Sequence, residues 1–186
     1  MEDRFFANEQ DIACVERALN EYISAQRELV KRYQGPIFAY IYRWLRNRAD
    51  AEDLTQDVFI KMFRALYSYS RQSSFRAWLY RIARNRVIDF LRRKKPQSVD
   101  IEDVVVEDGN LTPMEIYERS SEQEILQKVI DTLPPLYREV LLLRHRDELS
   151  YEEIVETTGI ALGTIKARLH RARGMLKKQL TEAKLL

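Results

Sequence analysis

The chain has 186 residues, of which 45% are hydrophobic and 32% are charged. This length allows one domain or two small ones and excludes a large multidomain enzyme. With only 5 Gly and 5 Pro the chain lacks the many tight turns of a β-sandwich or barrel, and its single cysteine excludes an internal disulfide framework. No apolar run approaches the ~18 residues of a membrane span and no signal-type apolar core follows the start. We therefore expect a soluble, cytoplasmic protein without membrane insertion.

The formal net charge of +2 hides an uneven distribution. Residues 97–124 carry nine acidic residues and one basic residue, so this segment has a net charge of −8 and the rest of the chain +10. A basic body interrupted by an acidic segment is typical of lobes that bind a polyanion, joined by a segment with another role.

The first ninety residues show the apolar spacing of helices. One helix is expected over residues 9–34 and should end before Gly35-Pro36. A second helix is expected over residues 37–46. Ile37, Ile41, Trp44 and Leu45 are its expected inward residues.

A third helix is expected to begin at Asp50, acting as the N-cap, with an apolar stripe at Leu54, Val58, Met62, Ala65 and Leu66. After a polar turn at 70–74, a fourth helix is expected to end on basic residues before Pro96. Its expected core face is Phe75, Leu79, Ile82, Val87, Phe90 and Leu91. These four helices predict a small bundle.

Residues 97–111 show no sustained period, and Val104-Val105-Val106 is better explained as part of a linker than as a strand. Thr112-Pro113 predicts the start of a helix that lasts until the prolines at 134–135. A further helix is expected over 136–146. The sequence therefore predicts an all-α protein with two helical lobes.

The C-terminal segment has the pattern of a helix-turn-helix. Ser150 and Glu153 form a capping box, Gly159 can provide a left-handed turn, and a second helix begins within 161–164. The apolar line of that second helix is Ile165, Leu169, Ala172 and Leu176.

The second helix of this motif carries charge of one sign. Five cations lie from Lys166 to Lys177, and no acid follows until Glu182. A helical hairpin with a solvated basic face is the alternative, but such faces usually mix signs. The uniform charge favours a helix that enters the major groove of DNA.

The fourth helix and the turn before it interleave basic and aromatic residues. This pattern suits single-stranded nucleic acid, because each exposed base can stack at about 1–3 kcal/mol while cations follow the backbone. Aromatic residues at helical spacing also form cores, so both interpretations stay open for Phe75 and Trp78. The pattern comprises Tyr67, Tyr69, Arg71, Phe75, Arg76, Trp78, Tyr80, Arg81, Arg84, Asn85 and Arg86.

Clustered carboxylates near residue 50 admit a metal-dependent nuclease as an alternative. Helix capping alone explains most of them, however, and no phosphate loop or HExxH motif accompanies them. Cys14 is expected to be a small buried residue. We therefore expect no enzyme activity, no metal and no cofactor.

Three segments resemble bacterial sigma factors. Residues 50–59 (DAEDLTQDVF) resemble their core-polymerase-binding helix, and residues 75–85 (FRAWLYRIARN) the promoter-melting segment that follows. Leu133-Pro134 and residues 163–173 (GTIKARLHRAR) resemble the promoter-reading domain. Their order and spacing are similar to those of the extracytoplasmic-function group, which keeps only two domains.

The resemblance implies sigma domain 2 over residues 1–96, an acidic linker over 97–112 and sigma domain 4 over 113–186. Its polymerase-binding residues would be Asp50, Glu52, Asp53, Gln56 and Asp57. Contacts with the melted minus-ten element would come from Tyr67, Tyr69, Arg71, Phe75, Arg76, Trp78, Arg81, Arg84 and Asn85. The minus-thirty-five element would be read by Lys166, Ala167, His170 and Arg171, with Thr164, Arg168 and Arg173 on phosphates.

The resemblance also implies a function: a transcription initiation factor that binds core RNA polymerase and promoter DNA, both as duplex and as melted single strand. It would serve a stress or envelope response, and an anti-sigma protein would hold it inactive. A dimeric helix-turn-helix regulator and the nuclease are the alternatives from other classes.

Overall fold

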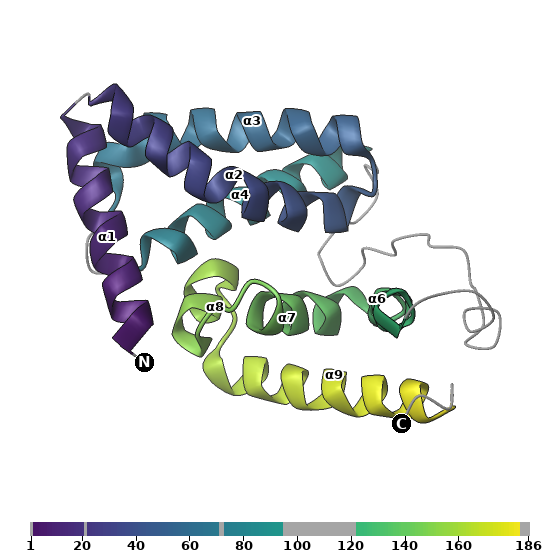
Figure 1. The fold of residues 1–186 in the computed structure, drawn as a ribbon. Helices are drawn as coiled ribbons and strands as arrows, with labels where there is room; N and C mark the ends of the chain where they lie inside the picture. The colour runs from purple at the N-terminus through teal and green to yellow at the C-terminus, as the bar shows by residue number, and fades with distance from the viewer. Residues whose placement is uncertain (1, 21, 71–72, 95–121, 183–186) are drawn as a thin grey trace. The chain divides into compact units, whose positions relative to one another are not determined.

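The computed structural model describes residues 2–20, 22–70, 73–94 and 122–182, and all regular structure in these ranges is helical (Figure 1). The prediction of an all-α protein is therefore confirmed. The chain divides into an N-terminal and a C-terminal unit, each described by itself below. The predicted linker over 97–112 and the predicted helix start at Thr112-Pro113 lie outside the described residues.

The N-terminal unit contains helices α1 (Glu2–Leu19) and α2 (Ile23–Leu45), which pack against each other. The prediction of one helix over 9–34 is wrong, because α1 ends at Leu19 and α2 begins at Ile23. There the amides of Asn20 and Tyr22 donate to the carbonyls of Glu16 and Arg17, both at 3.2 Å.

Helix α2 continues through Gly35-Pro36, where the sequence predicted an end. Pro36 is exposed, and its ring removes one backbone hydrogen bond from the helix, a change that costs about 3 kcal/mol. Tyr33, Ile37 and Ile41, however, are buried on either side of it. Burying each large apolar side chain contributes about 1.5–3 kcal/mol, so packing outweighs the local preference. Of the side chains expected inward at 37–46, Ile37, Ile41 and Trp44 are buried and Leu45 is half-buried.

Helix α3 (Arg48–Ala65) begins after Asn47, whose side chain accepts a hydrogen bond from the amide of Asp50 at 3.1 Å. The prediction of Asp50 as the N-cap is therefore wrong. Asp50 lies in the first turn instead, where its carboxylate faces the positive end of the helix dipole. The predicted apolar stripe is confirmed: Leu54, Val58, Met62 and Leu66 are buried and Ala65 is half-buried.

A short 3-10 turn, η1 (Leu66–Ser68), follows α3 and leads to α4 (Phe75–Lys94). The end of α4 on basic residues agrees with the prediction. Its core face is as predicted at Phe75, Leu79, Ile82 and Val87, which are buried, while Phe90 and Leu91 are only half-buried. Helices α2, α3 and α4 pack on one another around this core.

In the C-terminal unit α9 packs against α6 and α7, around a core to which α8 contributes Ile154. Its central buried residues are Leu133, Val140, Leu143, Leu149, Ile154, Ile165, Leu169 and Ala172. At the far end of α9, Leu176 and Leu180 pack against buried Val129. The helices are α6 (Glu122–Asp131), α7 (Pro135–His145), α8 (Tyr151–Thr158) and α9 (Leu162–Glu182).

Two local devices position α8 against α9, and both were predicted. The amide of Ser150 donates to Glu153 Oε2 at 2.7 Å, and the amide of Glu153 donates to Ser150 Oγ at 3.0 Å. This is the reciprocal capping box. Gly159 follows α8 with φ of +74°, a conformation that costs glycine little and side-chain-bearing residues more.

Replacing Ser150 by alanine is expected to destabilise the C-terminal unit by about 1 kcal/mol, because the amide of Glu153 loses its acceptor. Thermal unfolding followed by circular dichroism should show a melting temperature of this unit lower by about 4–8 °C. Ser150→Thr keeps a hydroxyl in the same place, so this variant should lose much less stability than Ser150→Ala. Equal losses for the two variants would show that the hydroxyl does not cap α8.

Candidate nucleic-acid interfaces

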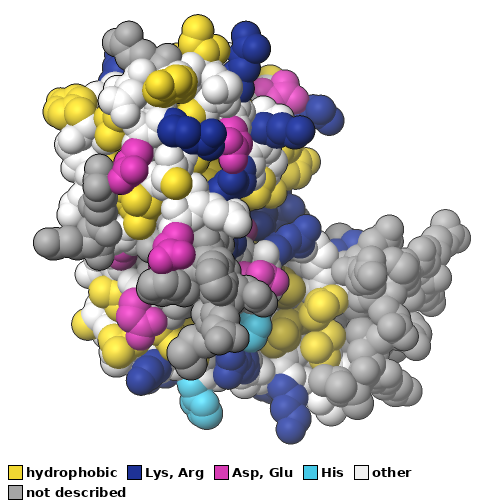
Figure 2. Space-filling view, turned by 60° about the vertical axis from the view of Figure 1, so that its left-hand side comes forward, with side chains coloured by type: hydrophobic (Ala, Val, Ile, Leu, Met, Phe, Trp, Pro, Cys, Tyr) yellow, Lys and Arg dark blue, Asp and Glu magenta, His cyan; other side chains and the backbone are white. Residues whose placement is uncertain are grey.

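One face of α3 gathers the acidic residues that the sequence singled out. Asp50 is half-buried, and the other three acids lie exposed with Gln56, on the side away from buried Ala51, Leu54 and Val58. Figure 2 shows acidic side chains beside Lys and Arg in the upper part of the visible surface. The predicted set, Asp50, Glu52, Asp53, Gln56 and Asp57, therefore shares one helix and its exposed side.

Three of these carboxylates are already paired within the chain. Asp50 accepts from Lys94 Nζ at 2.7 Å, and Asp57 pairs with Arg86, so both are joined to α4. Glu52 pairs with Arg48 at 2.8 Å one turn away. Asp53, by contrast, is exposed and has no ion pair or hydrogen-bond partner in the part of the chain that the structure describes. Its charge is the one most available to a partner protein.

The nuclease interpretation needs these acids to converge on a metal ion. In the described ranges, no group of three or more His, Cys, Asp or Glu side chains is arranged to hold a metal. The acidic residues of α3 instead spread along the helix, where the dipole and neighbouring cations account for them.

Three aromatic residues predicted to contact DNA lie inside the N-terminal unit. Phe75 is fully buried, and its ring centroid is 5.5 Å from that of Tyr69 and 5.7 Å from that of Trp78. Tyr33 on α2 adds an edge-on contact to Phe75 at 5.5 Å. We call Tyr33, Tyr69, Phe75 and Trp78 the aromatic cluster. The structure thus shows Phe75 and Trp78 packed in the core, and their contact with DNA stays a prediction.

Tyr69 ties the aromatic cluster to the loop before α4. Its hydroxyl donates to the carbonyl of Ser73 at 2.6 Å. Burial raises the pKa of Tyr69 to about 12, so the phenol keeps the proton that it donates. Two residues earlier, Tyr67 on η1 is 82% exposed and presents its ring to solvent.

The polar members of the predicted minus-ten set stand on α4. Arg81 and Asn85 are exposed one turn apart, and Arg76 and Arg84 are half-buried. Arg71 lies outside the described residues. Of the predicted minus-ten set, Tyr67, Arg81 and Asn85 are therefore exposed, whereas Tyr69, Phe75 and Trp78 are buried.

The exposed side of α9 is basic. Ile165, Leu169 and Ala172 are buried, and Ala167, His170 and Arg171 occupy the opposite side of the helix. The predicted reading set is exposed except for half-buried Arg168: Thr164, Lys166, Ala167, His170, Arg171 and Arg173. Helical spacing thus brings all seven residues onto the accessible surface of one helix.

Neighbouring helices order some of these side chains. Arg173 Nη2 lies 3.1 Å from Nε2 of His145 on α7. Burial and the charge of Arg173 lower the pKa of His145, so its neutral ring can accept that hydrogen bond. Lys166 lies 5.9 Å from the ring centroid of Tyr151 on α8. Arg171 has no such partner among the described residues.

Sequence reasoning missed one set of contacts. A buried carboxylate on α1, Asp11, hydrogen-bonds to Tyr33, the α2 member of the aromatic cluster. The available signal was the position of Asp11 four residues before buried Val15, on what should be an apolar face.

Family models match both units of the chain. Sigma-70 region 2 matches residues 29–97, which include α3 and α4, and Sigma-70 region 4 matches residues 123–176. Together these matches cover more than half of the sequence. Among the described residues, no helix combines the length and apolar character needed to cross a membrane.

Curated relatives agree with these models. The ECF RNA polymerase sigma factor SigE of Mycolicibacterium smegmatis is 38% identical over 160 residues, covering 83% of this chain and 61% of that protein. The ECF RNA polymerase sigma factor SigW of Bacillus subtilis is 36% identical over 166 residues, covering 83% of this chain and 88% of that protein. This chain therefore spans less than two thirds of the first relative and most of the second.

Solved structures show a similar fold. The sigma factor RpoE, in complex with the anti-sigma factor NepR from Bartonella quintana, gives a TM-score of 0.65 at 26% identity, covering 83% of this chain and 96% of that one. CnrH, in complex with the cytosolic domain of CnrY, gives a TM-score of 0.67 at 24% identity, covering 92% of this chain and 97% of that one.

Proposed function

Since this chain belongs to the extracytoplasmic-function group of bacterial RNA polymerase sigma factors, we propose that its two units divide promoter recognition between them. Residues 1–96 would form sigma domain 2, residues 97–112 a linker and residues 113–186 sigma domain 4. The chain is a transcription initiation factor whose partners are core RNA polymerase and promoter DNA. In this proposal it acts in the cytoplasm, and it is not an enzyme.

The exposed face of α3 would dock on core polymerase. Its exposed carboxylates suit a partner surface that carries cations. Asp53 supports this assignment most directly, because no described residue neutralises it. Asp50, Glu52, Gln56 and Asp57 would complete the contact.

The surface around Tyr67 would hold a base extruded from the minus-ten element. Unstacking a base costs a few kcal/mol, and stacking on an exposed aromatic ring returns about 1–3 kcal/mol. Tyr67 supports the stacking role through its exposure, and Arg81 and Asn85 offer donors to the strand. Because Tyr69, Phe75 and Trp78 are buried, we propose that they support this surface from behind.

Helix α9 would read the minus-thirty-five element in the major groove. Ala167, His170 and Arg171 face away from the core and would meet base edges together with Lys166. Thr164, Arg168 and Arg173 lie toward the flanks of the helix and would contact phosphates.

An anti-sigma protein would hold the chain inactive until a stress or envelope signal releases it. The RpoE structure similar to this chain was solved in complex with an anti-sigma factor. A polypeptide that covers the α3 face would block polymerase and so silence the factor without touching DNA.

One observation carries this proposal: an exposed carboxylate face on α3 and a capped helix-turn-helix with a uniformly basic second helix occur in one chain, in the family's order. Either feature alone would fit a simpler DNA-binding protein. Together they match the needs of a factor that bridges polymerase and promoter.

Reconstituted transcription tests the proposal. Core polymerase from the source bacterium, supplied with this chain and fragmented genomic DNA, is expected to start at sites that share two spaced elements, as shown by sequencing of transcript 5′ ends. Core polymerase alone is the control. Starts indistinguishable from the control would contradict the proposal. Tight binding to palindromic duplex without polymerase would favour a dimeric regulator, and DNA cleavage in Mg²⁺ or Mn²⁺ a nuclease.

A further inference from the structure

We propose that Asp11 is a positioning residue for promoter melting, acting from α1 through Tyr33 on the aromatic cluster that supports the minus-ten surface. This inference rests on the proposed function of that surface. Helix α1 precedes the segment matched by the region 2 model, which begins at residue 29.

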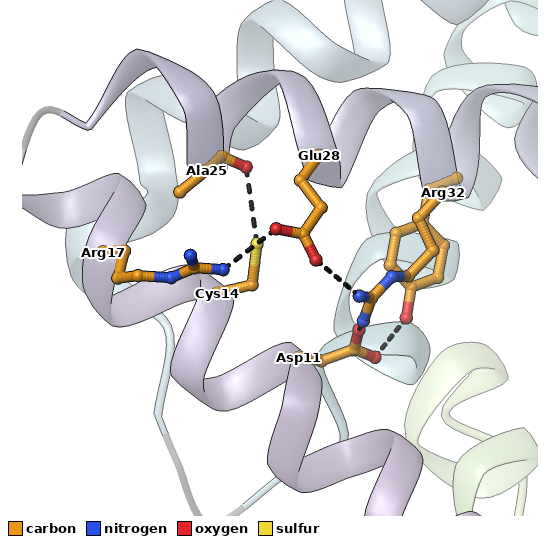
Figure 3. A network of polar contacts seen from close by, with 7 residues as sticks. Asp11, Cys14, Arg17, Ala25, Glu28 and Arg32 are labelled. Carbon is orange, nitrogen blue, oxygen red and sulfur yellow. Dashed lines mark hydrogen bonds and ion pairs between the residues drawn. The ribbon is translucent and has the colours of Figure 1, made fainter.

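Asp11 is the buried centre of a polar network between α1 and α2 (Figure 3). Asp11 is 4% exposed in a unit whose interior is otherwise mostly apolar. Tyr33 donates its hydroxyl proton to Asp11 Oδ2, and Arg32 Nη1 donates to Oδ1. Both carboxylate oxygens are therefore satisfied by consecutive residues of α2, which sets α1 at a defined position on that helix.

The network extends outward from Asp11 toward solvent. Arg32 Nη2 donates to Glu28 Oε1 at 2.8 Å, and Arg17 Nη2 donates to Glu28 Oε2 at 2.9 Å. These outer ion pairs are partly exposed. They are expected to contribute little to folding stability, because water screens surface ion pairs. The Tyr33 bond is the buried one.

Tyr33 connects the contact between α1 and α2 to helix α4. Its ring meets Phe75 edge-on, with centroids 5.5 Å apart and planes at 65°. Phe75 in turn contacts Tyr69 and Trp78, and Tyr69 bonds to the carbonyl of Ser73. The contacts therefore run from α1 to the loop that follows exposed Tyr67.

Removal of the carboxylate would disturb this path in a specific way. The Tyr33 hydroxyl would be left buried without an acceptor, which is costlier than removing donor and acceptor together. Burial by itself raises the pKa of Tyr33, so the phenol cannot relieve the loss by ionising. The ring must shift to reach water or another acceptor, and Phe75 loses its edge contact.

The test uses the full-length chain with core polymerase and a promoter identified by the transcription assay. Asp11→Ala is expected to slow open-complex formation about tenfold on duplex DNA, measured by permanganate reactivity of minus-ten thymines. On a promoter with that region already unpaired, the defect should fall to about twofold, and the affinity for core polymerase should stay unchanged. Glu9→Ala, an exposed carboxylate on the same helix, is the matched control and should melt as fast as the parent.

A second variant separates positioning from general damage. Adding Tyr33→Phe to Asp11→Ala removes the orphaned hydroxyl and keeps the ring, so the double variant should melt faster than Asp11→Ala alone. If Asp11→Ala melts as fast as the parent, or is equally slow on both templates with weaker polymerase binding, or gains nothing from Tyr33→Phe, the proposal is overturned. Failure of the parent chain itself to initiate would instead overturn the proposed function and this inference with it.

Discussion

Replacing Asp53 by arginine is expected to weaken binding of the chain to core RNA polymerase about tenfold or more, the equivalent of ~1.4 kcal/mol. Asp53 is exposed in the middle of the acidic face and has no partner among the described residues, so a cationic partner meets its full charge. Reversing that charge replaces an attraction by a like-charge contact, which costs more than its removal. Titration of labelled chain with core polymerase at moderate salt measures the effect.

Two variants make this test specific. Glu9→Arg introduces the same cation on α1 and should leave the affinity for polymerase unchanged. Asp50→Asn should have a smaller effect than Asp53→Arg, because Lys94 already neutralises Asp50. If all three variants bind core polymerase as the parent does, α3 is not the docking helix.

The second large effect is expected from Arg171. Its side chain is exposed on the side of α9 opposite the core and has no partner among the described residues. Arg171→Ala should lower transcription from a promoter with both elements by about 10- to 100-fold, since a bidentate contact with a base discriminates by about 1–3 kcal/mol. The loss should come with relaxed preference at one base pair of the minus-thirty-five element.

Lys178 provides the control on the same helix. It is exposed about two turns further along, where Glu182 lies 3.9 Å from its Nζ. Lys178→Ala should reduce transcription by less than about threefold and leave base preference intact, as expected for a distant phosphate contact. Equal losses for both variants, without any change in base preference, would show that α9 contributes only general charge.

The elements of this fold could be predicted wherever local and tertiary preferences agree. The capping box at Ser150, the turn at Gly159 and the buried line of α9 were all readable, because each depends on residues within one or two turns. The end of the first predicted helix could not be predicted in this way. Gly35-Pro36 signals a break locally, but the buried residues on both sides of it hold α2 together, and that packing involves helices distant in sequence.

The candidate sites could be predicted as sets but not as arrangements. Spacing alone placed the acids on one helix and the cations on another. It could not show that Asp57 is paired with Arg86, 29 residues away, or that Asp53 has no partner among the described residues. Aromatic residues beside cations fit a stacking surface and a core equally well. The full burial of Phe75 and its contact with Tyr33 show that this residue belongs to the core.

The two ion pairs between α3 and α4 bear on how the free chain meets a polyanion. Lys94 is paired with Asp50, and Arg86 with Asp57. Because these two cations are already neutralised, they would release fewer counterions from the DNA backbone on binding than unpaired cations would. The affinity of the N-terminal unit for DNA should therefore be lower than its number of arginines and lysines suggests. That affinity should also depend less on salt concentration.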